Sequence, residues 1–173
     1  MENLELYWLR HGTAEDKKPG QSDAERHLTE EGIEEIRYVA KCLKRLNLEI
    51  DFVFTSPLVR AVQTAERAAE VLGLEENVHV CEGLLPEDHW EILRDALLGH
   101  MPFSRALLVG HQPSFGQMIG RLICPGSGLE IPLKKAGLCR VDVDGLGKNP
   151  QGELVWLLNP KILKKITKVK NRS

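Results

Sequence analysis

The sequence predicts an α/β protein, a three-layer α/β/α sandwich whose mostly parallel central sheet has an antiparallel edge. Along most of the chain, short apolar runs alternate with segments of helical periodicity. This alternation is typical of a parallel sheet covered by helices on both faces. The last two apolar runs follow each other without a helix between them, which predicts the antiparallel edge.

The first half of the chain alternates strand and helix. Residues 4–9 form a short apolar run that predicts a buried strand. From Thr29 to about residue 46, apolar residues recur at three- and four-residue steps, as on one face of a helix. A second strand is expected at 51–54. Ser56 and the proline after it then supply an N-cap and a first helical residue, which predicts a helix ending at Gly73.

The second half continues this alternation and then changes. A strand is expected at residues 78–81, a helix from about Asp88 to Leu98, and a fourth strand at 106–109. The segment GHQPS precedes a further helix that ends near Ile123. Glycine-rich segments separate the last two strands, at 138–143 and 154–158, and a short helix begins near Pro160.

Length and composition indicate one soluble domain covering residues 1–173. Hydrophobic residues make up 42% and charged residues 28% of the 173 positions, and the net charge is −2. This balance gives no field that would favour nucleic acid or a membrane as a partner. A basic stretch at about residues 164–173 is interpreted as a solvated, partly frayed end, with a binding element as the alternative.

The beginning of the chain and the cysteines point to the cytoplasm. The opening residues include acidic side chains and no long apolar run, so neither a signal peptide nor a spanning helix is expected. The cysteines form no CxxC pair and are interpreted as reduced, small apolar residues. They are Cys42, Cys81, Cys124 and Cys139. No metal-ligand spacing is present among the remaining histidines, so no metal or other cofactor is expected.

Reactive side chains follow three of the predicted parallel strands. Arg10 and His11 follow the first strand, Arg60 lies a few residues after the second, and His111 follows the fourth. Ligands of open α/β sheets bind outside the carboxyl ends of the strands. We therefore expect two histidines and two arginines in one crevice, with two helix N-termini behind them. Guanidinium groups and helix N-termini both favour a phosphate-like anion.

Each of these residues has a structural alternative when taken alone. His11 and His111 fit as hydrogen-bonded strand-end histidines, and Arg10 fits as a surface ion-pair partner. Arg60 is harder to explain, because a cation in the first turn of a helix opposes the helix dipole. The coincidence of all four favours an anion site.

The motifs around these residues resemble the histidine phosphatase superfamily, which includes phosphoglycerate mutases. Arg10-His11-Gly12 resembles its RHG signature. The segment from Ser56 to Ala65, SPLVRAVQTA, is similar to its SPxxRAxQTA motif, and Val109-Gly110-His111 to its later GH segment. Residues 23–32 and 156–163 resemble the compact SixA-type phosphohistidine phosphatases. The resemblance covers nearly the whole chain and implies a phosphoglycerate-mutase-like fold.

The resemblance implies metal-independent phosphoryl transfer to His11, followed by hydrolysis. His11 must attack as a neutral imidazole, and we expect a backbone carbonyl to hold its other ring N–H. Arg10, Arg60 and a protonated or donor-oriented His111 would stabilise charge on the phosphoryl oxygens. In the family, a carboxylic acid after the third strand protonates ester leaving groups. Glu82, Glu87 and Asp88 lie in this region, and Glu82, which is nearest the predicted strand end, is the candidate. A solvated loop carboxylate is the alternative for Glu82.

The polar segment of residues 12–28 carries a further candidate. It follows a strand end and shows no apolar periodicity, as functional loops often do. Arg26 is a candidate phosphate ligand, with an ion pair that closes the loop as the alternative. Whether this segment acts as a lid is left open.

Three functions remain open from the sequence. The first is a protein phosphohistidine phosphatase, whose partner is a phosphohistidine-containing protein such as a phosphotransfer domain. The second is a phosphomonoesterase that acts on a small phosphorylated substrate and needs Glu82 as an acid. The third is a phosphate-binding module without turnover, which the presence of a candidate nucleophile disfavours. A mutase is not expected from so short a chain.

Overall fold

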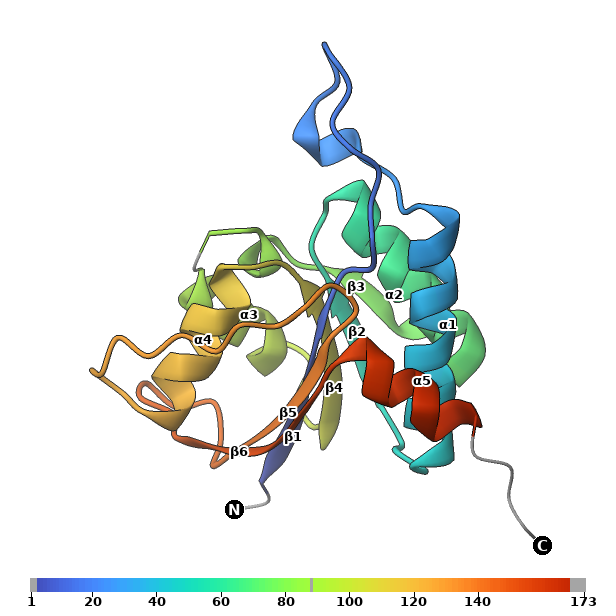
Figure 1. Cartoon of the computed structure of the whole chain (residues 1–173). Coiled ribbons are helices and arrows are strands. Elements are labelled where there is room, and N and C mark those ends of the chain that lie inside the picture. Colours follow the sequence, from blue (N-terminus) through green and yellow to red (C-terminus); the bar gives the residue numbers. More distant parts are fainter. Residues whose placement is uncertain (1–2, 88, 169–173) are drawn as a thin grey trace, which may run out of the picture.

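The computed structural model describes residues 3–87 and 89–168 (Figure 1). The strands are β1 (Leu4–Arg10), β2 (Phe52–Thr55), β3 (Val78–Val80), β4 (Arg105–Gly110), β5 (Leu138–Val143) and β6 (Gly152–Leu158). The helices are α1 (Glu30–Arg45), α2 (Val59–Leu72), α3 (Trp90–Leu98), α4 (Ser114–Ile123) and α5 (Pro160–Lys168). Three 3-10 helices are η1 (Asp23–Glu25), η2 (Glu75–Asn77) and η3 (Glu82–Leu84).

The strands form one six-stranded sheet in the order β3-β2-β4-β1-β5-β6. Strands β1 to β4 are parallel to one another, and β5 runs antiparallel to both of its neighbours. Parallel neighbours need a crossover connection, whereas β5 and β6 are joined directly by a turn. The predicted mostly parallel sheet with an antiparallel edge is therefore confirmed.

Alternating side chains of β1 pack into two separate cores. Leu6 and Trp8 join a cluster with residues of α3 and α4, whereas Tyr7 and Leu9 join a cluster with residues of α1, α2 and α5. Figure 1 shows these two groups of helices on opposite faces of the sheet. The period of two in a strand thus produces the three layers that the sequence predicted.

The expected cap of the second helix is wrong. Helix α2 begins at Val59 with Leu58 as its N-cap residue, and no side chain caps it. The Ser56 hydroxyl instead accepts a hydrogen bond from the Leu58 N–H and contacts the His111 ring. By contrast, Thr29 caps α1 as expected, because its hydroxyl accepts a hydrogen bond from the Gly32 N–H.

Two predictions fall partly outside the described residues. The third helix is expected to begin at about Asp88, which lies outside the described residues, and α3 starts at Trp90. Of the basic stretch at 164–173, residues 164–168 belong to α5, and the remainder lies beyond the described chain.

Residues 12–28, here called the arm, project from the body of the molecule at the top of Figure 1. Its two ends are joined by an isolated antiparallel bridge between Ala14 and Leu28, and the Glu15 N–H donates to the His27 carbonyl. The arm contains η1, which is closed by a reciprocal capping box between Ser22 and Glu25. The arm is therefore an ordered extension on the side of the sheet where β1 ends.

The cysteines are unpaired. Cys42, Cys81 and Cys139 are buried and Cys124 is exposed. Within residues 3–87 and 89–168, no helix combines the length and apolar character needed to cross a bilayer.

Candidate active site

The ends of the three central strands bring the predicted residues together. Strands β2, β4 and β1 are neighbours and parallel, so the segments that follow them leave the same edge of the sheet. The His11 and His111 ring centroids are 5.0 Å apart, and Arg60 Nε lies 3.3 Å from His11 Nε2. These residues are only 6%, 2% and 3% exposed, respectively. The two histidines and Arg60 therefore form one buried cluster.

The hydrogen bonds of His11 fix its tautomer. Nδ1 lies 2.7 Å from the Gly12 carbonyl oxygen, as expected of a backbone carbonyl. Because a carbonyl can only accept, Nδ1 carries the ring proton. The Arg60 Nε–H can only donate, so Nε2 presents its lone pair toward this group. The imidazole is thus held with its nucleophilic nitrogen inside the cluster.

His11 is neutral near pH 7. Burial lowers the pKa of His11 to about 4. The hydrogen bond to Gly12 acts in the opposite direction, but the charges of Arg60, Arg10 and Lys135 lower this pKa further. A lone pair on Nε2 is therefore available over the whole neutral range.

His111 is also neutral. Burial, followed by the neighbouring His11 and Arg60, lowers the pKa of His111 to about 2. Its Nε2 lies 2.8 Å from the Ser56 hydroxyl oxygen, and its Nδ1 is buried without a partner among the described residues. A buried polar nitrogen without a partner is an exception that a bound ligand can resolve. Of the two expected forms of His111, the donor-oriented neutral ring is the one that this environment favours.

Arg60 links the cluster to the arm. Its Nη1 donates to the Asp23 carbonyl oxygen at 2.7 Å, and its Nη2 donates to the Asp23 carboxylate at 2.9 Å. Partial burial raises the pKa of Asp23, but the charges of Arg60 and Arg26 outweigh this and hold it below its ordinary value. Asp23 is therefore an ionised carboxylate placed where a phosphate oxygen would meet the same guanidinium.

Arg10 lies at the end of β1, beside the cluster. Its Nη1 donates to the Leu133 carbonyl at 2.8 Å, and its Nε is buried without a partner among the described residues. Its charge lowers the pKa of both His11 and His111. Arg10 thus contributes positive potential to the site while one guanidinium nitrogen is held by the backbone.

Four side chains of the segment from Ser56 to Thr64 hold the site together. Ser56 contacts His111, and Arg60 contacts His11. The Gln63 side-chain oxygen accepts from the Leu28 N–H at the base of the arm. The Thr64 hydroxyl accepts from the Gly12 N–H and donates to the Arg60 carbonyl. The beginning of α2 therefore connects all three strand ends with the arm.

Two glycines allow the first strand end to approach α1. A Cβ atom at Gly12 would lie 2.8 Å from the Gly32 carbonyl oxygen, and one at Gly32 would lie 2.1 Å from the Thr13 carbonyl oxygen. Any side chain at Gly32 would push the backbone of residues 12 and 13 away. The glycine that follows His11 therefore allows close packing beside this histidine.

The two remaining candidates lie differently from the cluster. Glu82 opens η3 and is exposed, and its side chain makes no hydrogen bond or ion pair with the rest of the described chain. Arg26 donates to the Asp23 carboxylate at 2.9 Å and to the Glu15 carbonyl at 3.0 Å. For Arg26 the geometry is that of the expected alternative, an ion pair that closes the loop.

Three interactions of the site were not anticipated from the sequence. They are the Asp23 clamp on Arg60, the contact of Ser56 with His111 and the attachment of the arm through Gln63. Asp23, Ser56 and Gln63 all lie in the segments that carry the family resemblance, which is the signal that could have marked them. Each interaction joins residues far apart in the chain, so no local pattern predicts the partner.

Comparison with known proteins places these features in a family. The family model described as the histidine phosphatase superfamily (branch 1) matches residues 6–93. An uncharacterised protein of Picosynechococcus is 35% identical, over 92% of this chain and 99% of the relative. The phosphohistidine phosphatase SixA of Escherichia coli is 30% identical, over 93% of this chain and 97% of the relative.

A solved structure shows the same fold. The protein histidine phosphatase SixA, determined in complex with tungstate, superposes with a TM-score of 0.82 at 29% sequence identity. The match covers 93% of this chain and 100% of the solved one. The fold class implied by the resemblance is therefore confirmed.

Proposed function

The chain belongs to the histidine phosphatase superfamily and is a phosphatase, and we propose that it hydrolyses protein phosphohistidine through a phosphoryl intermediate on His11. The observation that carries this proposal is the tautomer of His11. The Gly12 carbonyl holds the proton on Nδ1, so Nε2 has a lone pair inside a buried, cationic cluster.

In the first step, the lone pair of His11 Nε2 attacks phosphorus. The P–N bond of the substrate breaks, and its electron pair goes to the leaving imidazole nitrogen, which takes a proton from solvent. Negative charge is spread over the three remaining phosphoryl oxygens in a loose transition state. Arg60 and Arg10 stabilise this charge, and His111 donates a hydrogen bond to it. The phosphoryl oxygens replace the Asp23 oxygens as hydrogen-bond acceptors of Arg60 Nη1 and Nη2.

In the second step, water attacks the phosphorus of phospho-His11. The Nε2–P bond breaks, its electron pair returns to Nε2, and the water protons leave with phosphate and solvent. The low pKa of His11 favours release of a neutral imidazole. The Gly12 carbonyl keeps the ring in the same tautomer through both steps.

Among the residues that the structure describes, neither Glu82 nor Asp23 is placed as a proton donor, which favours phosphohistidine over a phosphate ester. An alkoxide leaving group is strongly basic and needs a placed acid, whereas an imidazole leaving group does not. Glu82 is exposed, and Asp23 is held ionised by two arginines. The 30% identical relative that is named a phosphohistidine phosphatase supports the same substrate class. A phosphotransfer domain is the kind of partner we propose, and the cytoplasm is the proposed compartment.

The test compares substrates under identical conditions. The protein is incubated, with EDTA present, with a phosphohistidine-containing protein and separately with simple sugar phosphates, and released phosphate is measured. Release from the phosphohistidine protein alone is expected. Release from the esters alone would establish the phosphomonoesterase instead. Binding of phosphate without release from either substrate would establish the binding module.

A further inference from the structure

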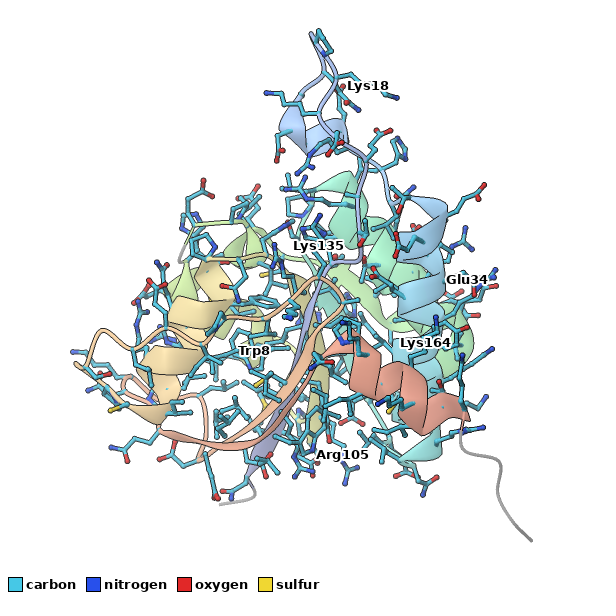
Figure 2. All side chains as sticks on the ribbon, in the orientation of Figure 1. Trp8, Lys18, Glu34, Arg105, Lys135 and Lys164 are labelled. Carbon is cyan, nitrogen blue, oxygen red and sulfur yellow. The ribbon has the colours of Figure 1, made fainter. Side chains whose placement is uncertain are left out.

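A groove of about 530 Å³ lies between α1 and α5, beside the phosphoryl site. One of its walls carries cationic side chains, contributed by the segment before β5 and by α5. They are Lys134, Lys135, Lys161 and Lys164. Figure 2 labels Lys135, Lys164 and, from α1, Glu34, on the three segments that line the groove. We call this the α1–α5 groove.

The groove reaches the phosphoryl site through Arg10. This residue lines the groove and also acts electrostatically on both His11 and His111. Lys135, on the groove wall, contributes to the same field at His11. A ligand in the groove could therefore extend, through Arg10, to a phosphoryl group positioned at His11.

The two walls of the groove differ in whether their charged side chains have partners within the protein. On the α1 wall, Glu35 accepts a hydrogen bond from the Thr13 N–H, and Glu34 pairs with Arg37. Glu31 on this wall is exposed. The four groove lysines, by contrast, have no carboxylate within ion-pair distance in the part of the chain that the structure describes. The unneutralised charge of the groove is therefore mainly positive and lies along α5 and residues 134–135.

The positive charge continues along α5 beyond the residues that line the groove. Helix α5 carries Lys161, Lys164, Lys165 and Lys168, and it has no acidic residue. From Lys161 to Lys168 the helix rises about 10 Å, at about 1.5 Å per residue. Charges spaced over this length match several carboxylates on a polypeptide.

We infer that the α1–α5 groove docks an acidic segment of the phosphoprotein substrate. The carboxylates of this segment face α5 and residues 134–135 while the phosphohistidine enters the site at His11. The inference rests on the proposed function and adds to it the chemistry that selects the partner. Such rim charges chiefly set the encounter rate and the choice of partner, and their effect weakens with salt.

The test uses charge reversal at two matched positions. Lys161→Glu changes the groove, and Lys148→Glu makes the same change in charge at an exposed position in the connection between β5 and β6. A glutamate near the N-terminus of α5 is also compatible with the helix. The substrates are two phosphohistidine peptides, one with flanking Asp and Glu residues and one with Asn and Gln in their place.

For the acidic peptide, Lys161→Glu is expected to lower kcat/KM about fivefold, and the double variant Lys161→Glu/Lys164→Glu about tenfold or more. The loss should shrink as salt is raised. The amide-containing peptide should be hydrolysed equally by all variants, and Lys148→Glu should match the wild type on both peptides. Equal losses on both peptides, or no loss on the acidic one, would overturn the docking proposal.

A binding measurement separates this proposal from the proposed function. The dissociation constant of the fluorescently labelled acidic peptide is measured on His11→Ala, with and without Lys161→Glu. Weaker binding in the double variant supports the groove even if the wild type hydrolyses no phosphohistidine. Identical binding overturns the groove even if hydrolysis is observed. Circular dichroism of α5 variants checks that the helix is retained.

Discussion

The proposed phosphoryl site has two sides that are built differently. Its floor consists of His11, His111 and Arg60, which follow neighbouring parallel strands and are almost completely buried. Its other side is the arm, where the Asp23 side chain is 51% exposed and is held by arginine contacts. The floor is positioned by the sheet and its two cores, whereas the arm is positioned by a small number of polar contacts.

In the proposed mechanism, this difference separates groups that perform the reaction from groups that adjust it. A floor residue cannot move without disturbing buried neighbours, so its geometry is fixed before the substrate arrives. The Asp23 contacts with Arg60 are of the kind that a phosphate oxygen can replace. We therefore expect substitutions in the floor to change the chemistry by orders of magnitude, and substitutions in the arm to change it severalfold.

The largest effect is expected for His11→Ala. Loss of the nucleophilic Nε2 should reduce turnover of the phosphohistidine protein by about 10⁴-fold or more, as loss of a nucleophile does elsewhere. His27→Ala is the matched control, because the ring of this exposed arm histidine hydrogen-bonds with Gln63 and does not belong to the buried cluster. Turnover rates and acid-labile radiolabel on the protein are measured for both. Retained labelling in His11→Ala would show that another residue accepts the phosphoryl group.

Arg60→Lys comes next. Lysine keeps the charge but loses the Nε–H that faces His11 and the paired Nη groups that hold Asp23. We expect kcat/KM to fall by about 10²–10³, the range for one lost transition-state donor. Arg26→Lys, on the arm side of the same carboxylate, should cost less than tenfold. Comparable losses in the two variants would mean that Asp23, rather than the phosphoryl group, is the essential partner of Arg60.

The floor was more predictable from the sequence than the arm. Arg10, His11, Arg60 and His111 could be placed together because parallel strands end at the same edge. The cap assigned to Ser56 was wrong because the rule is local, whereas its hydroxyl is used by His111, 55 positions away. The grip of Asp23 on Arg60 spans 37 positions and depends on how the arm folds back. Short-range sequence patterns cannot predict contacts between residues that are so far apart in the chain.

The two histidines of the floor should stay neutral at mildly acidic pH. Because the pKa of His11 is about 4 instead of its usual 6.5, the imidazole stays neutral as the pH is lowered through 6. At pH 5.5 it retains almost all of its neutral form, about ten times more than an unperturbed histidine. NMR titration of the imidazole resonances should show His11 and His111 unchanged between pH 8 and about 5. A His11 midpoint near 6.5 would mean that the floor is not closed to water.

The smallest effect is expected for Asp23→Asn. The amide keeps a hydrogen-bonding oxygen but removes the negative charge that competes with phosphate for Arg60. Inhibition by inorganic phosphate should therefore become about two- to fivefold stronger, the size of a partly exposed ion pair. Ser22→Ala, which disturbs the arm without touching Arg60, provides the control.

The direction of the Asp23→Asn change distinguishes two roles for the arm. If Asp23 occupies Arg60 only until the substrate arrives, removing its charge strengthens phosphate binding, and kcat changes little. If Asp23 is needed to orient the guanidinium toward His11, the same substitution weakens phosphate binding and lowers kcat together. The first outcome keeps the arm separate from the reaction, because a competitor for Arg60 has been removed. The second would make Asp23 part of the floor, because the position of Arg60 would then depend on an exposed side chain as well as on α2.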